Sequence, residues 1–181
     1  MAGPTRSQPP YSSLTPADAS VALRSFGRRF VDAGRAAVAD LDDEPDQDQI
    51  DEFASRPGAD GRSAIDHVAS AAERLEEIRA SMRSALLSDT HTIDAALFDP
   101  DRVAPPVHSG HLDAEIDRLD QAATALAHEV DDADDNRWLG QRPTSTGGRA
   151  TPLDLLRSGV EFTVHHLRAM ERVLREVRGR A

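Results

Sequence analysis

The sequence predicts an all-α fold, a four-helix bundle within one domain, and three observations lead to it. Apolar residues recur at steps of three and four, the spacing of one helical face, in four separate stretches. Aromatic residues make up only 4% of the chain, so a core must be built from Leu, Val, Ile and Ala. The β-branched and aromatic runs typical of sheets are scarce. Four helices with one apolar stripe each are expected to pack as a bundle.

The first helix is expected over residues 16–41. Thr15, Pro16 and Asp18 are residue types typical of a helix start. Residues 1–14 are rich in Pro, Ser and Gly and are expected to form a flexible arm, which leaves 15–181 as the bundle domain. The acidic stretch of residues 40–52 is interpreted as a solvated connector with a short helical turn at its end. A calcium loop is the alternative, although the stretch lacks the glycine and the ligand spacing of an EF-hand.

The second and third helices are expected over residues 63–87 and 109–131. Ser63 and Asp66 form a capping-type start for the second helix. A Pro-containing irregular stretch separates the two helices. His91 and His108 have no helical partner at metal-ligand spacing and are expected in surface loops. His111 and His128 fall off the apolar stripe of the third helix and are expected to be exposed.

The fourth helix is expected over residues 151–178, after a loop of Gly, Ser, Thr and Pro. Thr151 caps it, Pro152 suits its first position, and Asp154 completes a capping box. Trp138, the only tryptophan, lies before that loop and is expected to cover an end of the core. One apolar stripe defines the inward face of this helix: Leu153, Leu156, Val160, Val164, Leu167, Met170, Leu174 and Val177.

Charge and composition exclude some classes of partner. The formal net charge is −11, with 32 acidic and 21 basic residues, so the surface repels nucleic-acid phosphates and anionic membranes. The chain has no cysteine, and therefore no disulfide or thiolate chemistry of its own. No apolar run is long enough for a signal peptide core or a membrane span. We expect a cytoplasmic protein that binds neither nucleic acid nor membranes.

The fourth helix carries the strongest candidate for chemistry. Glu161 and His165 are four residues apart, so they share one face and are able to bind the same divalent ion. His67, near the start of the second helix, is the candidate third ligand, and two histidines with one glutamate form a known catalytic zinc set. A solvated Glu161–His165 pair is the alternative. His166 has only Phe162 at the same spacing and is expected at the surface or in the second shell.

Short motifs resemble a known family. They are Arg56-Pro-Gly, Ser63-Ala-Ile-Asp-His67-Val-Ala, Thr151-Pro-Leu-Asp-Leu-Leu and Val164-His-His-Leu. The chain resembles the DinB-like four-helix proteins, in the branch that contains mycothiol-dependent maleylpyruvate isomerase, over roughly Pro16 to Val177. That resemblance implies a divalent metal on His67, Glu161 and His165, zinc or nickel, and a small thiol such as mycothiol as cofactor.

Two departures from the family pattern shape the expected function. Arg62 stands where the family often has a tryptophan, and the isomerase has a further C-terminal lobe whereas this chain ends at Ala181, so that isomerase activity itself is not expected. The resemblance implies a metal-dependent, thiol-using S-transferase or isomerase that acts on a small molecule. The alternative is a metal-free binding or structural bundle that has lost the site, as a homodimer.

Overall fold

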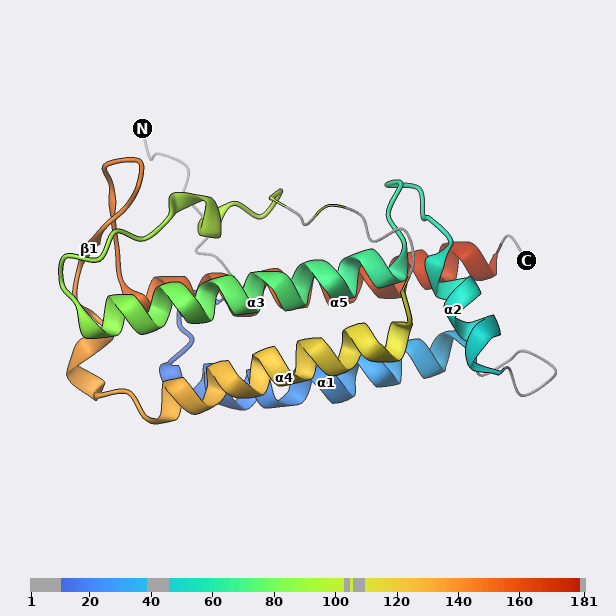
Figure 1. The fold of residues 1–181 in the computed structure, drawn as a ribbon, viewed down its shortest axis with the longest axis horizontal. Coiled ribbons are helices and arrows are strands. Elements are labelled where there is room, and N and C mark those ends of the chain that lie inside the picture. The colour runs from blue at the N-terminus through green and yellow to red at the C-terminus, as the bar shows by residue number, and fades with distance from the viewer. Residues whose placement is uncertain (1–10, 39–45, 103–104, 106–109, 180–181) are drawn as a thin grey trace, which may run out of the picture.

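The structure is a computed structural model that describes residues 11–38, 46–102, 105 and 110–179. It confirms the all-α prediction, because four long helices lie side by side as a bundle (Figure 1). Most of the arm predicted for residues 1–14 lies outside the described residues, as do His108 and residues 39–41 of the first predicted helix. The four long helices are α1 (Pro16–Val38), α3 (Ala64–Leu87), α4 (Leu112–Asp131) and α5 (Pro152–Arg178).

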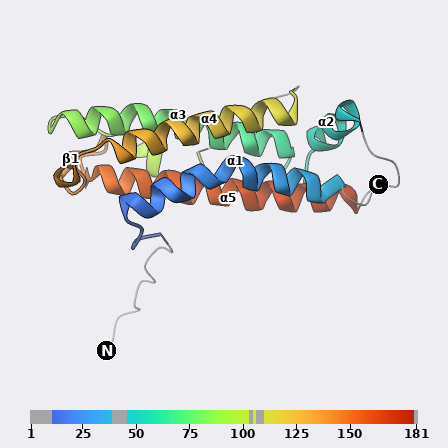
Figure 2. The same cartoon turned by 90° about the horizontal axis from the view of Figure 1, so that it is seen from below.

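The helices pack in a square in which α1 and α3 each contact α4 and α5. Along the chain, α1 and α5 run in one direction, and α3 and α4 run in the other (Figure 1). Figure 2 shows α3 with α4 in one layer, and α1 with α5 in the other. Because α3 and α4 run in the same direction, the end of α3 and the start of α4 lie at opposite ends of the bundle, and residues 88–111 form the segment that joins them. We call this segment the α3–α4 connection.

Helix starts follow the capping chemistry expected from the sequence. Ser63 and Thr151 both form complete capping boxes, with Asp66 and Asp154 as their partners. The core between the helices consists of aliphatic side chains and a few phenylalanines, as the composition required. The largest fully buried core residues include Leu23, Phe26, Phe30, Leu75, Ile78, Met82, Leu119, Leu126, Leu155 and Leu156.

Short elements close the two ends of the bundle. At one end, α2 (Gln47–Ser55) is a full helix where only a short turn was expected, and it begins with a capping box of Asp46 and Gln49. At the other end, β1 (Arg142–Pro143) and β2 (Arg149–Ala150) pair in an antiparallel hairpin inside the predicted loop. Two 3-10 turns, η1 (Ala95–Phe98) and η2 (Asp135–Arg137), complete the described elements.

Trp138 confirms its predicted place, because only 3% of it is exposed, at the end of the core that the hairpin closes. Its carbonyl accepts the Leu153 N–H at 3.3 Å, which joins this end of the core to the start of α5. No described helix is long and apolar enough to cross a membrane.

Candidate metal centre

Two histidines meet between α3 and α5. His67 lies in the first turn of α3 and His166 lies near the middle of α5, and their Nδ1 atoms are 3.1 Å apart. Only 3% of His67 and 1% of His166 are exposed. We call these two residues the histidine pair. Its position requires α3 and α5 to lie close together in register.

Local sequence sets that register. The Ser63 hydroxyl accepts the Asp66 N–H at 3.1 Å, which fixes the first turn of α3 and with it the position of His67. Farther along the same interface, Gly159 lets the helices approach, because a Cβ there would lie 2.9 Å from Cδ1 of Ile78. Capping of α3 and close packing at Gly159 therefore set the relative position of the two helices that carry the histidine pair.

Burial keeps both imidazoles neutral at pH 7. Loss of solvent lowers the pKa of His67 to about 4, and the charges of Arg62 and Arg172 add to this while Asp60 opposes it. Burial likewise lowers the pKa of His166 to about 3, helped by the charge of His67. Neutral imidazoles offer a ring nitrogen lone pair, which is the form that binds a metal ion.

The outer nitrogens of the pair are less well satisfied. Nε2 of His67 lies 3.4 Å from a carboxylate oxygen of Asp60, which also contacts Arg172 at 3.3 Å. This contact is not directed as a hydrogen bond, and it becomes an ion pair only if His67 is protonated. Both Nε2 atoms are buried without a hydrogen-bond partner. Asp60 is therefore a charged neighbour of the His67 ring and does not accept a hydrogen bond from it.

Arg62 supports this end of α3 through hydrogen bonds to its first two turns. Its guanidinium donates to the Ser70 hydroxyl at 2.7 Å and to the Asp66 carbonyl at 3.3 Å. It therefore packs along the first two turns of α3 and places a positive charge near His67.

Phe162 lies one helical turn before His166, and its ring packs against the His166 ring. The ring centroid of Phe162 lies 4.3 Å from that of His166, and the Arg74 guanidinium lies 4.1 Å from the Phe162 ring. Arg74 is itself buried and donates to the carbonyls of Leu97, Asp99 and Arg102 in the α3–α4 connection. A phenylalanine with this support has no atom that binds a metal, so the position contributes packing only.

The three residues named by the sequence do not meet in one place. His67 faces His166, whereas Glu161 and His165 are exposed on α5 and line a separate hollow of about 160 Å³. Within the described residues, no group of three His, Asp or Glu side chains is arranged to hold a metal ion.

Of the two places expected for His166, the surface is wrong, because the residue is buried. The sequence argument took one apolar stripe as the inward direction, but α5 contacts both α1 and α3 and therefore buries a wider face. Thr163 and Met170, three residues before and four after His166, are both fully buried. Thr163, His166 and Met170 are spaced three and four residues apart, so they lie on one side of the helix. This spacing was the signal in the sequence that His166, rather than His165, points inward.

The histidine pair supplies two ligands to one metal ion. Two nitrogens bound to one tetrahedral zinc at about 2.0–2.1 Å each stand about 3.3 Å apart, near the observed Nδ1–Nδ1 separation. A direct hydrogen bond between the two rings has a similar length. The residue one helical turn before His166, where a third donor would stand, is Phe162.

Comparisons of the chain with family models, with curated proteins and with solved structures found no match.

Proposed function

We propose that this chain is a DinB-like protein that holds a divalent metal ion, zinc or nickel, between His67 and His166. We propose further that it uses the ion with a small thiol of the mycothiol type, in an S-transfer or isomerisation of a small molecule. One observation carries the proposal: two neutral, buried imidazole nitrogens converge to 3.1 Å from two different helices. The motif resemblance and the all-α bundle support it.

The chain's own residues have defined tasks under this proposal. His67 and His166 supply two nitrogen ligands, and the Asp60 carboxylate beside Nε2 of His67 favours the tautomer whose Nδ1 is free. A bound divalent ion supplies a lowered pKa for a coordinated thiol or water. Since the chain has no cysteine and Phe162 offers no donor, the other ligands come from outside the protein.

Glu161 and His165 take a second role in this proposal. They line the 160 Å³ hollow together with Phe162, whose ring contacts His166. A small molecule in that hollow is separated from the histidine pair by the Phe162 ring. Glu161 and His165 are then contacts for the substrate, and Phe162 controls its approach to the ion.

A second candidate is favoured by Phe162 itself. The Phe162 ring packs on His166, and the two imidazoles satisfy each other if one Nδ1 donates to the other. This arrangement suits a metal-free binding or structural bundle in which the family's site has become part of the core. The sequence also favours a homodimer in that case, which light scattering on the purified protein tests directly.

Metal analysis of protein purified without a histidine tag distinguishes the two candidates. The proposal expects one zinc or nickel per chain, lost in His67→Asn and His166→Asn and retained in the matched control His165→Asn. If the metal is instead lost in His165→Asn and Glu161→Gln but retained in His166→Asn, the ion is bound by the three residues that the sequence predicted. Metal-free protein in all variants, with thermal stability indifferent to added zinc, supports the second candidate.

Phe162→Glu provides a gain-of-ligand test. It places a carboxylate one turn before His166 and completes three donors with His67. Tighter zinc binding in Phe162→Glu than in the wild type shows that the helices already hold the geometry of a metal site. Phe162→Gln, which is similar in size and uncharged, is its control.

A further inference from the structure

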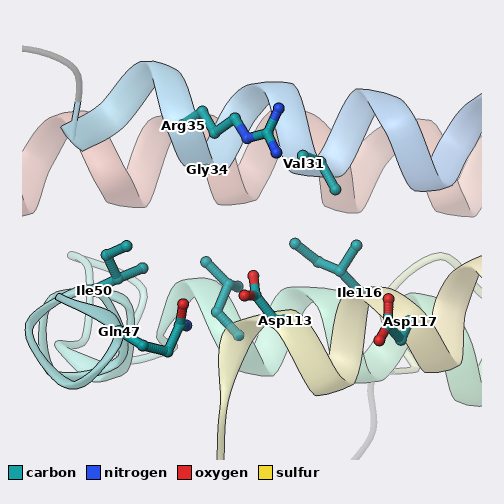
Figure 3. A pocket seen from close by; sticks show the side chains of 9 residues that line it. Val31, Gly34, Arg35, Gln47, Ile50, Asp113, Ile116 and Asp117 are labelled. Carbon is teal, nitrogen blue, oxygen red and sulfur yellow. The ribbon is translucent and has the colours of Figure 1, made fainter. Parts of the chain in front are cut away.

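One feature that the histidine pair does not explain is a hollow between α1, α2 and α4, which we call the α1–α2–α4 pocket (Figure 3). Its volume is about 420 Å³, within the range of small-molecule sites. Its apolar lining comes from all three helices, from Val31 on α1, Ile50 on α2, and Leu112 and Ile116 on α4. The histidine pair lies between a different pair of helices, α3 and α5, so the two features are independent.

Charges of opposite sign stand on facing walls of the pocket. Figure 3 shows Arg35 on the α1 wall, and Asp113 and Asp117 on the facing α4 wall. Within the part of the chain that the structure describes, none of these three side chains makes a hydrogen bond or ion pair. The carboxylates are one helical turn apart, a spacing at which like charges repel each other. A bound cation relieves that repulsion.

We propose that the α1–α2–α4 pocket binds a small zwitterion, an ω-amino acid whose ammonium and carboxylate are separated by an apolar chain. The ammonium lies between Asp113 and Asp117, and the carboxylate accepts two N–H groups of Arg35. The apolar chain covers the aliphatic lining between them. An α-amino acid, whose two charges are adjacent, is the comparison that tests whether the apolar chain between the charges is needed.

The pocket is formed before any ligand arrives, because Asp51 joins α2 to the start of α4. Its carboxylate accepts the Leu112 N–H at 2.8 Å and the His111 imidazole at 2.6 Å, and only 8% of Asp51 is exposed. Hydrogen bonding to these two groups keeps the pKa of Asp51 below its ordinary value despite burial. A wall fixed in this way reduces the ordering cost of binding.

The test is titration of the full-length protein with 4-aminobutyrate, 6-aminohexanoate and 8-aminooctanoate. Binding is measured by calorimetry and by the NMR shifts of α1 and α4 amides. Hexylamine and hexanoate each carry one of the two charges, and leucine carries both at one carbon. We expect at least one ω-amino acid to bind more tightly than hexylamine, hexanoate and leucine. The Asp113→Asn/Asp117→Asn double variant and Arg35→Gln should each weaken it by about tenfold or more.

Asp32→Asn is the matched control, because Asp32 is an exposed carboxylate on α1 that does not line the pocket. Binding in Asp32→Asn should equal that of the wild type. The inference is overturned if no ω-amino acid binds more tightly than about 10 mM. It is equally overturned if the double variant and Arg35→Gln bind as well as Asp32→Asn, or if hexylamine alone binds as tightly as the best ω-amino acid. None of these outcomes depends on the metal content of the protein.

Discussion

The histidine pair and the α1–α2–α4 pocket place polar groups between helices in two different ways. His67 and His166 are sealed from solvent, neutral and in contact with each other, whereas Arg35, Asp113 and Asp117 are exposed, charged and separated. Burial penalises charge, so the two buried histidines pair as neutral species. At the surface, water screens the charges and lets them stay apart. We therefore expect the first region to affect stability and the second to affect ligand binding.

The largest effect on stability is expected from His166→Ala. The substitution opens a cavity in the core and leaves Nδ1 of His67 without its partner, at a cost of about 3 kcal/mol in the free energy of unfolding. The matched control His165→Ala removes an exposed imidazole and should change that free energy by less than about 0.5 kcal/mol. Urea unfolding in the presence of a chelator measures both. Equal costs for the two variants would contradict the burial of His166.

Acid should destabilise the metal-free protein next most strongly. The folded-state pKa values of about 4 for His67 and about 3 for His166 lie below the ordinary value of 6.5. As the pH falls below about 6.5, the unfolded chain binds protons that the folded chain does not, so stability decreases with falling pH. Each histidine contributes about 1.4 kcal/mol per pH unit in this window.

Urea unfolding between pH 7 and pH 5, again with a chelator, checks the acid prediction. The pH dependence should be reduced in His67→Gln and smaller still in the His67→Gln/His166→Gln double variant. A stability curve that is flat for the wild type over this range would show that the pair accepts a proton without cost, against the burial argument.

Asp51→Ala should have a smaller effect that is confined to one end of the bundle. It removes the acceptor for the Leu112 N–H and the His111 ring, at a cost of about 1–2 kcal/mol. Hydrogen exchange should accelerate in α2 and in the first turn of α4, and remain unchanged near the histidine pair. Acceleration across all helices would mean that α2 is needed for the whole fold rather than for one wall of the pocket.

The smallest effect is expected where the charges are exposed. The Asp113→Asn/Asp117→Asn double variant should leave the free energy of unfolding within about 0.5 kcal/mol of the wild type. Relief of like-charge repulsion should make any change a slight gain in stability. Thermal unfolding measures this, and a marked destabilisation would show that the two carboxylates serve the fold rather than a ligand.

The four long helices were predictable because local chemistry and packing agree along them. Ser63 with Asp66 and Thr151 with Asp154 are local capping signals, and they remain helix starts in the folded chain. The helix α2 was missed as a full element because its apolar residues, Ile50 and Phe53, stand in an acidic run. Its own capping residues, Asp46 and Gln49, were the signal for it.

The histidine pair was only half predictable. His67 was predicted to bind a metal ion together with Glu161 and His165, whereas in the structure its ring contacts His166. Neighbouring residues on a helix differ by about 100° in direction, and a single stripe does not reveal how wide the buried face is. That width depends on how many helices surround α5, which is a property of the assembled bundle.

Because α3 and α4 are parallel, the folded state requires both halves of the chain. All four long-helix interfaces join a helix before the α3–α4 connection to a helix after it, since α1 and α3 pack on α4 and α5. Neither half of the chain therefore contains a neighbouring pair of long helices of its own. Two fragments divided in the connection would each lack a core, and would acquire one only by assembling with the other. The bundle is in this sense built like a heterodimer of two incomplete halves that a single covalent segment joins.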